Sequence, residues 1–248
     1  MADRAAIVTG ASSGIGLAAT RMLAQSGHAV TMVARRPEKL AAACEQLLGE
    51  GLEVQQVAAN VGDEDDVVRV VAAHREAYGR LDVLMNNAGV GIGAPIGELS
   101  TKRMDIQLAT NLRALPLFYR EALELLTAAG AEHRNALVVN MASIAGKQGE
   151  AWLSIYSATK FGVVGFTQSM NRELNALGIK STALCPGFVD TAMTDFVKEH
   201  VAAEDMIQTS DIVAAVRLLL DLSPGCVIPE IIFQLPGGGQ LDAGPGRP

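Results

Sequence analysis

Short apolar runs alternate along this chain with longer amphipathic stretches. The apolar runs are rich in Val, Ile, Leu and Ala, which is typical of strands buried on both faces of a parallel sheet. The intervening stretches have the apolar period of helices that cover such a sheet. The pattern therefore predicts strands at residues 5–9, 27–34, 52–57, 81–85, 136–141, 179–184 and 227–235, with helices between most of them.

This alternation predicts an α/β fold. We expect a single doubly wound, Rossmann-type domain over residues 1–248, with a seven-stranded, mostly parallel sheet and helices on both faces. No linker or low-complexity segment divides the chain. Residues 188–208 show no clean period and are expected to form a mobile lid, whereas the tail at 236–248 is rich in Gly and Pro and is expected to be frayed and flexible.

Composition and charge exclude several classes of function. Hydrophobic residues make up 49% of the chain and charged residues 19%, which is a globular profile. The net charge of −7 argues against nucleic acid or an anionic membrane surface as a partner. No run is long and apolar enough to span a membrane, and the N-terminus lacks the pattern of a signal peptide.

The cysteines and histidines give no sign of a disulfide framework or a metal site. Cys44, Cys185 and Cys226 are scattered, odd in number and form no C-x-x-C motif, so we expect reduced thiols in a cytoplasmic protein. The four histidines are equally dispersed, and no pair has metal-ligand spacing. We therefore expect no bound metal.

A glycine-rich segment, Gly10-Ala11-Ser12-Ser13-Gly14-Ile15-Gly16, joins the first predicted strand to a helix at 17–25. Glycines in this place let the backbone turn tightly and approach a pyrophosphate, and the helix start supplies free N–H groups and a positive dipole end. The spacing is G-x-x-x-G-x-G, and an ordinary flexible turn is the alternative. Its position after the first strand favours dinucleotide binding.

Two arginines, Arg35 and Arg36, follow the second predicted strand, where dinucleotide sites often carry an acidic residue that binds the ribose 2′-hydroxyl. Guanidinium groups bind a 2′-phosphate strongly, so the pair favours NADP over NAD. One alternative is that the two arginines are a solvated basic pair at a helix start. The other is that the cofactor is NAD.

Small polar residues and glycines follow three more predicted strands. They are Asn86-Asn87-Ala88-Gly89, Ala142-Ser143 and Cys185-Pro186-Gly187. The carboxyl ends of parallel strands line the crevice where α/β sheets bind ligands, so these residues are expected to meet there.

Polar residues also mark helix starts and one helix distortion. The run Asp63-Glu64-Asp65-Asp66 is expected to form the negative first turn of a helix, and Ser210 is expected to cap the helix at 211–222. Residues 101–129 have a helical pattern that is interrupted near Asn111 and Pro116. Asn111 is a poor helix former among apolar neighbours, so we expect a local distortion that turns it toward the site; a core amide is the alternative.

The segment Tyr156-Ser157-Ala158-Thr159-Lys160 places a phenol and an ammonium on one face of a helix. An unperturbed phenol has a pKa near ~10, and a nearby cation is expected to lower the pKa of Tyr156 toward the working range of a proton donor. A Tyr-x-x-x-Lys pair alone is weak evidence, because helices carry many such pairs by chance.

Taken together, these motifs resemble the short-chain dehydrogenase/reductase family over nearly the full length, from Thr9 to about Leu235. The motifs occur in the family's order: the glycine segment at 9–16, the Asn-Asn-Ala-Gly segment at 86–89, Asn111, Ser143, Tyr156-x-x-x-Lys160 and Pro186-Gly187. The resemblance implies an oxidoreductase that transfers a hydride between NADP(H) and a carbonyl or secondary alcohol.

The resemblance also implies roles for individual residues. Tyr156 would donate the proton, Lys160 would bind the nicotinamide ribose and lower the phenol's pKa, Ser143 would hold the carbonyl oxygen, and Asn111 would anchor a water. The cofactor would be held by Gly10, Ser12, Ser13, Gly14, Ile15, Gly16, Arg35, Arg36, Asn60, Val61, Asn87, Ala88, Gly89, Tyr156, Lys160, Pro186, Gly187, Val189 and Thr191.

The chain departs from the family pattern at Asn60-Val61, where many members carry Asp before a small apolar residue to bind adenine. An apolar set of candidate pocket residues suggests a moderately hydrophobic ketone, aldehyde or secondary alcohol: Val90, Ile92, Ile144, Trp152, Phe188, Met193 and Phe196. The family commonly forms dimers or tetramers, which the apolar stretch at 163–174 allows. A nucleotide-binding sensor or scaffold without catalysis is the alternative of a different class.

Overall fold

The computed structural model describes residues 3–199 and 201–236, so most of the expected flexible tail lies outside the described residues. Its centre is a seven-stranded sheet in the order β3-β2-β1-β4-β5-β6-β7. Every pair of neighbouring strands is parallel, so the predicted Rossmann-type sheet is confirmed and is fully rather than mostly parallel. The strands are β1 (Arg4–Thr9), β2 (His28–Ala34), β3 (Val54–Ala58), β4 (Val83–Asn86), β5 (Ala136–Met141), β6 (Ile179–Pro186) and β7 (Glu230–Phe233).

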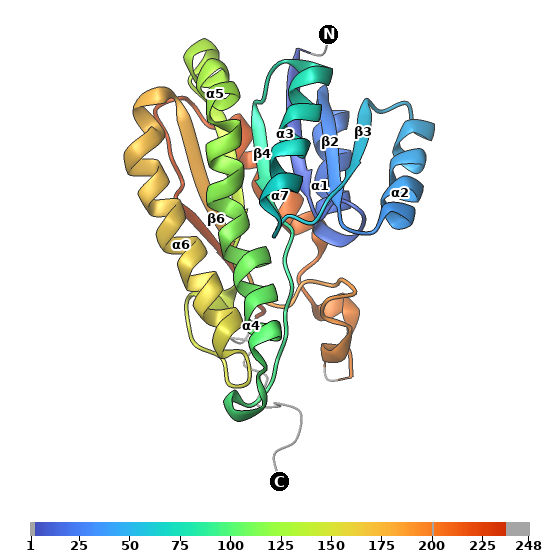
Figure 1. Ribbon diagram of the computed structural model, residues 1–248, viewed down its shortest axis with the longest axis vertical. Coiled ribbons are helices and arrows are strands. Elements are labelled where there is room, and N and C mark those ends of the chain that lie inside the picture. The colour runs from blue at the N-terminus through green and yellow to red at the C-terminus, as the bar shows by residue number, and fades with distance from the viewer. Residues whose placement is uncertain (1–2, 200, 237–248) are drawn as a thin grey trace.

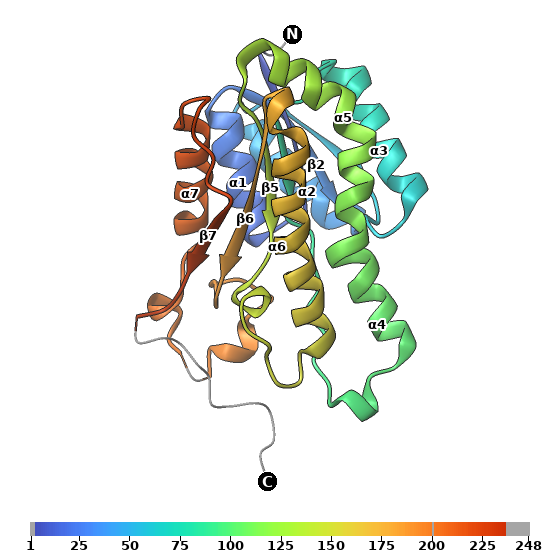
Figure 2. The same cartoon turned by 90° about the vertical axis from the view of Figure 1, so that its left-hand side faces the viewer.

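Helices cover both faces of this sheet (Figures 1 and 2). On one face lie α1 (Gly14–Gln25), α2 (Pro37–Gly49) and α7 (Thr209–Asp221), and their buried side chains share a core with the sheet. On the other lie α3 (Glu64–Tyr78), α5 (Ala114–His133) and α6 (Ser154–Leu174), with α4 (Thr101–Leu108) leading into α5. Figure 2 shows the arrowheads of β6 and β7 pointing to the end of the molecule that carries α4.

Alternate residues of each strand point to opposite faces, as a pleated sheet requires. In β5, Leu137 and Val139 pack in the core with α1, α2 and α7, whereas Ala136 and Val138 pack against α3 and α5. Both faces of β5 are therefore buried, which explains why its sequence is a nearly continuous apolar run.

Two of the helix starts test predictions made from the sequence. The side chain of Asp63 caps α3 by accepting from the N–H groups of Asp65 and Asp66, so the acidic run marks a helix start as predicted. The prediction that Ser210 caps α7 was wrong. Gln208 is the N-cap, and it forms a capping box with Asp211, whose carboxylate accepts from the Gln208 N–H.

The long helical stretch is interrupted where the sequence indicated. Residues Ala109–Arg113 form a π-helical segment (η2) between α4 and α5, and the N–H of Ala114 donates to the carbonyl of Ala109. Pro116 has no N–H to donate to the carbonyl four residues before it, which is compatible with the wider turn there. The distortion buries Asn111, which is 1% exposed.

The segment after β6 contains two short 3₁₀ turns, at Asp195–Val197 and Ala203–Asp205, and an isolated parallel bridge between Val189 and Ile207. It leads into α7 on the α1 side of the sheet. Within the described ranges, no helix combines the length and the apolar character that crossing a bilayer demands.

Candidate active site

Three glycines shape the turn between β1 and α1. Gly10 and Gly14 have φ angles of +70° and +53°, in the left-handed region that L side chains rarely adopt. A Cβ on Gly16 would lie only 2.2 Å from the carbonyl oxygen of Gly10. Only glycines at these places let the chain turn tightly enough to bring the start of α1 to the end of β1.

The start of α1 is open to an anion. Its N-cap is Ser13, and within the described chain no side chain caps this end and no acidic residue lies in the first turn. Free N–H groups and the positive end of the helix dipole favour negative charge there. The residues fit a dinucleotide pyrophosphate, since all six predicted residues of this turn lie on it: Gly10, Ser12, Ser13, Gly14, Ile15 and Gly16.

The end of β4 is joined to the end of β1 by a residue that received no role from the sequence. The Thr9 hydroxyl accepts from the N–H groups of Asn87 and Ala88, each at 2.9 Å. The Asn87 amide donates to the Thr9 carbonyl at 2.9 Å. Asn87 and Ala88 therefore lie beside the glycine turn, with the Asn87 side chain engaged in holding the two strand ends together.

The η2 segment places Asn111 against the loop that follows β4. Its side-chain oxygen accepts from the Val90 N–H at 2.8 Å, and its amide nitrogen donates to the Val90 carbonyl at 2.9 Å. The same nitrogen donates to the Thr159 hydroxyl at 3.2 Å, which in turn donates to the Tyr156 carbonyl at 2.7 Å. Asn111 thus joins the η2 segment to α6 within the turn that carries Tyr156 and Lys160.

Lys160 is a buried ammonium with one hydrogen bond. Its side chain is 3% exposed, and Nζ donates to the carbonyl of Met141 at the end of β5, at 2.7 Å. Nζ also lies 5.5 Å from the centre of the Tyr156 ring. Burial lowers the pKa of Lys160 to about 8, because the charged form loses its hydration.

Tyr156 and Ser143 lie together at this edge. Ser143 follows β5, and its hydroxyl accepts from the Ala145 N–H at 3.2 Å and donates to the Pro186 carbonyl at 3.4 Å. Burial raises the pKa of the Tyr156 phenol, and the Ser143 hydroxyl acts in the opposite direction. The expectation of a lowered pKa for Tyr156 is therefore wrong for this structure, because loss of hydration outweighs the neighbouring groups.

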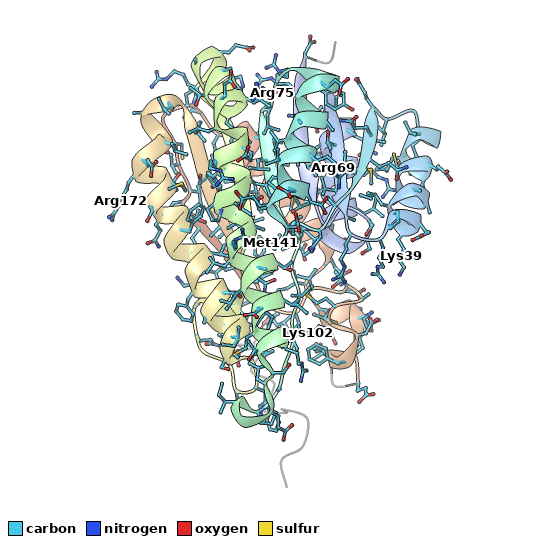
Figure 3. The ribbon with its side chains drawn as sticks, in the orientation of Figure 1. Lys39, Arg69, Arg75, Lys102, Met141 and Arg172 are labelled. Carbon is cyan, nitrogen blue, oxygen red and sulfur yellow. The ribbon has the colours of Figure 1, made fainter. Side chains whose placement is uncertain are left out.

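Gly89 marks the point where the motifs converge. A Cβ on Gly89 would lie 3.4 Å from the Asn111 side-chain oxygen and 3.7 Å from the Lys160 nitrogen. Segments from β4, η2 and α6 therefore meet within contact distance, close to Met141, which Figure 3 labels near the junction of α4 and α5. The structure brings together all four predicted catalytic residues: Asn111, Ser143, Tyr156 and Lys160.

The predicted adenosine side of the site is more open. Arg35 and Arg36 are exposed directly after β2, and Arg36 is the N-cap of α2. Val61 is buried, whereas Asn60 is exposed and its side-chain oxygen accepts from the Gly62 N–H at 3.2 Å. The Asn60 N–H donates to Asp66, so this turn is held by the start of α3.

The segment after β6 closes the other side of the glycine turn. Pro186 ends β6, and the Gly187 N–H donates to the Phe233 carbonyl of β7 at 2.9 Å. Val189 is buried and bridges to Ile207. A Cβ on Gly14 would lie 3.1 Å from the Thr191 methyl carbon, so Thr191 touches the cradle.

Several residues of the predicted pocket set have exposed apolar side chains. Met193 and Phe196 are 53% and 64% exposed on the segment after β6, and the Phe188 and Phe196 rings pack edge to face. On the loop before α6, Trp152 has a φ of +68°, which is unusual for a bulky residue, and its carbonyl accepts from the Ala94 N–H. These residues belong to the predicted pocket set.

Three groups at the site were missed by the sequence interpretation. The Thr9 and Thr159 hydroxyls join segments, and the Met141 carbonyl receives Lys160. Thr159 lies inside the Tyr156–Lys160 motif, but its spacing alone does not show which segment it contacts. A backbone carbonyl carries no sequence signal at all.

Comparison with known proteins places this geometry in a family. A family model described as short chain dehydrogenase matches residues 4–202. The chain is 41% identical over 202 residues to a protein assigned as ketoacyl reductase of the monensin polyketide synthase in Streptomyces virginiae, covering 81% of this chain and 76% of that protein. It is 32% identical to 3-oxoacyl-acyl-carrier-protein reductase FabG of Staphylococcus aureus, covering 83% and 82%.

Solved structures agree with this assignment. A variant of actinorhodin polyketide ketoreductase with NADPH has a TM-score of 0.82 and 34% identity, covering 94% of this chain and 97% of that one. A metagenomic short-chain oxidoreductase in complex with NADP has a TM-score of 0.79 and 31% identity, covering 93% and 96%. The chain therefore belongs to the short-chain dehydrogenase/reductase family of oxidoreductases.

Proposed function

We propose that this protein is an NADP(H)-dependent ketoreductase that interconverts a carbonyl and a secondary alcohol, with Tyr156 as general acid and base. The observation that carries the proposal is the convergence of Asn111, Ser143, Tyr156 and Lys160 beside an uncapped, glycine-lined helix start. A nicotinamide cofactor, when bound, supplies the hydride. The side chains at the carboxyl end of the sheet then donate the proton and stabilise the charge that develops on the substrate oxygen.

The raised pKa of Tyr156 suits a proton donor. At neutral pH the phenol keeps its proton, which it can pass from Oη to the substrate oxygen as negative charge grows there. The Ser143 hydroxyl, released from the Pro186 carbonyl 3.4 Å away, donates to the same oxygen and stabilises that charge. After the proton leaves, the Lys160 ammonium stabilises the phenolate, and with a pKa of about 8 it is still mostly charged at pH 7.

The proposed substrate is a ketone carried on an acyl chain. The predicted pocket residues are apolar, and three of them, Trp152, Met193 and Phe196, are exposed. The similar proteins from Streptomyces virginiae and Staphylococcus aureus are named for reactions on ketoacyl groups. A 3-oxoacyl thioester combines a reactive carbonyl with an apolar chain that such side chains can cover.

A substrate screen separates this function from that of a non-catalytic nucleotide sensor. NADPH oxidation is followed at 340 nm with 3-oxoacyl thioesters, aromatic ketones and aliphatic aldehydes. We expect turnover that is fastest with a 3-oxoacyl thioester. NADPH binding by fluorescence without turnover on any compound would instead favour the sensor.

The choice of cofactor rests on Arg35 and Arg36. Two exposed guanidiniums at the end of β2 favour a 2′-phosphate, and two of the similar structures hold NADP or NADPH. A 3-ketoacyl-(acyl-carrier-protein) reductase from Brucella melitensis, 25% identical, is complexed with NADH, so NAD(H) is the alternative. Arg35→Asp is expected to shift the NADPH/NADH ratio of kcat/KM toward NADH by ~100-fold, and an unchanged ratio would contradict the NADP preference.

We also propose that the protein forms a homo-oligomer in the cytoplasm. Phe161 on α6 is 46% exposed and Leu123 on α5 is 37% exposed, on neighbouring outer helices. We propose a homodimer or homotetramer that covers these side chains, to be tested by light scattering. All three cysteines are free, which suits the reducing cytoplasm.

A further inference from the structure

A buried hydrogen-bonded network lies behind the active site and centres on Asn140 of β5, which is 0% exposed. Its side-chain oxygen accepts from the Asn86 amide at 2.9 Å. Its side-chain nitrogen donates to the Tyr119 hydroxyl at 2.9 Å and to the Thr167 hydroxyl at 3.0 Å. Asn140 thus joins β4, β5, α5 and α6 through one side chain.

The network continues into β6. The Tyr119 hydroxyl donates to the Ser181 hydroxyl at 2.9 Å. Asn171 of α6 makes two hydrogen bonds to the backbone of Ser181, at 2.7 and 2.8 Å. All of these residues are buried, so α5 and α6 are both tied to the sheet by polar groups inside an otherwise apolar layer.

The direction of the hydrogen bonds is largely fixed. The Thr167 hydroxyl donates its own proton to the Val163 carbonyl at 2.7 Å, so toward Asn140 it can only accept. Asn140 must therefore present its nitrogen to Thr167 and its oxygen to Asn86. Among the described residues, the one buried side-chain atom without a hydrogen-bond partner is on Asn135, outside this network. A buried network whose members are all paired favours a single arrangement of the groups that it joins.

Asn140 also borders the groups that make up the active site. The next residue, Met141, gives its carbonyl to Lys160 Nζ. Asn86 lies opposite Asn140 in the sheet and precedes Asn87, which holds the end of β1. The polar network and the candidate active site are therefore joined by adjacent residues of the same two strands.

As a result, α6 is attached to neighbouring residues of β5 at two points. Lys160 binds the Met141 carbonyl, and Thr167, two helical turns further along the same face of α6, binds Asn140. Between them α6 packs through Val163 and Val164. Together with this packing and the bonds from Asn171 to β6, the two polar attachments to β5 fix the rotation of α6 and the position of Lys160 along the strand.

We propose that Asn140 is a positioning residue: through Thr167 it holds α6 so that Lys160 and Tyr156 face the cofactor cleft. This inference rests on the proposed function. It assigns a role in turnover to a buried amide that would touch neither substrate nor cofactor.

The test uses Thr167→Val, which keeps the shape and removes the oxygen that Asn140 requires. Thr31→Val in β2 is the matched control, because Thr31 is also 0% exposed and its hydroxyl also binds side chains, those of His74 and Gln55. Both variants leave a buried polar group unpaired, so both are expected to lower the melting temperature by a few degrees, about 2–8 °C. Thr167→Ser restores the oxygen and serves as the rescue.

In Thr167→Val we expect kcat to fall by ~10-fold to ~100-fold while the Kd for NADPH changes by less than ~3-fold, because α6 is displaced rather than the glycine cradle. Thr31→Val is expected to keep a kcat close to that of the wild type, and Thr167→Ser is expected to recover most of it. Equal values of kcat for Thr167→Val and Thr31→Val would overturn the proposal.

Hydrogen exchange gives a second readout that needs no turnover. Amides of residues 157–160, the first of which donates to the Leu153 carbonyl, are expected to lose protection by ~10-fold in Thr167→Val and to remain protected in Thr31→Val. Equal protection in the two variants would overturn the positioning role. If the wild type reduced no carbonyl compound, the proposed function would fail, while this comparison would still test whether Asn140 holds α6.

Discussion

The two ends of the sheet each hold a buried charge, and they treat it differently. At the amino end, Asp82 is 1% exposed and its carboxylate receives Arg80, the Ala5 N–H, His133 and Arg4. At the carboxyl end, Lys160 is 3% exposed, and among the described residues its one hydrogen-bond partner is the Met141 carbonyl. The Asp82 carboxylate is thus surrounded by hydrogen-bond donors, whereas the Lys160 ammonium has N–H groups left to donate to a ligand.

The pKa values follow the same contrast. Burial works to raise the pKa of Asp82, but hydrogen bonds from Arg80, the Ala5 N–H and His133 hold it below its ordinary value. Burial lowers the pKa of Lys160 to about 8, and no nearby carboxylate restores it. The amino end thus stabilises the fold, and the carboxyl end keeps a reactive group at a cost in stability, as a functional site can.

The largest effect is expected from Lys160→Met, which removes the charge and keeps most of the volume. Turnover should fall by ~10³-fold, because the phenolate loses its stabilising cation. Folding should suffer little: the lowered pKa corresponds to a cost of about 3 kcal/mol for the charged form, which offsets the roughly 1.5–3 kcal/mol of the lost hydrogen bond from the ammonium. Thermal unfolding should show an unchanged or higher melting temperature.

The buried charge of Lys160 makes the stability of the fold depend on pH. A folded pKa below the unfolded value destabilises the fold at low pH, and this cost is relieved as pH rises from about 8 to 10.5. Lys160→Met should therefore flatten the pH dependence of stability in that window. A clear loss of stability in the variant would contradict the contrast between the two ends.

Asp82→Asn is expected to give the opposite pattern. The variant leaves Arg80 and Arg4 without their buried partner, so the free energy of unfolding should fall by about 3 kcal/mol. Turnover should remain close to that of the wild type, since Asp82 lies at the far end of the sheet. Denaturant unfolding and a steady-state assay of the same preparation measure both effects. If Asp82→Asn lost activity without losing stability, the amino end of the sheet would not have the purely stabilising role described above.

A second buried titratable group, His74, lies near the amino end of the sheet. Its Nε2 donates to the Arg80 carbonyl, so Nδ1 carries no proton and accepts from the Thr31 hydroxyl. Burial is the main reason that the pKa of His74 falls to about 4. The unfolded state binds a proton below pH ~6.5 and the folded state does not, so stability should decrease by up to about 3 kcal/mol as pH falls from 6.5 to 4.

The check is urea unfolding of the wild type and His74→Gln across that pH range. The variant should start with lower stability at pH 7 and lose less of it on acidification. Parallel curves for the two proteins would show that another group carries the acid sensitivity.

Local signals in the sequence predicted much of the fold and of the candidate site. Glycine sterics fixed the turn after β1, the apolar runs predicted the strands, and the π-helical distortion at Asn111 followed from a polar residue among apolar neighbours. Each depends on near neighbours in the chain. The N-cap of α7 was predicted at Ser210 because serine is a common N-cap residue, whereas the helix begins two residues earlier with a capping box between Gln208 and Asp211.

Features that depend on tertiary packing could not be predicted. The direction of the pKa shift of Tyr156 depends on how deeply α6 and its neighbours bury the phenol. The partners of Asn140 and Thr159 come from segments distant in the chain, and no spacing indicates them. The order of strands places these segments together, but side-chain hydrogen bonds between helices and sheet appear only in three dimensions.

In the proposed mechanism, Tyr156 gives its proton to the substrate oxygen at the carboxyl end of the sheet. The most direct test is single-turnover oxidation of NADPH by wild type and Tyr156→Phe with the best substrate of the screen, alongside NADPH binding by fluorescence. We predict a rate loss of ~10²-fold to ~10⁴-fold with NADPH affinity within ~3-fold of wild type. A variant that kept most of the wild-type rate would contradict the account.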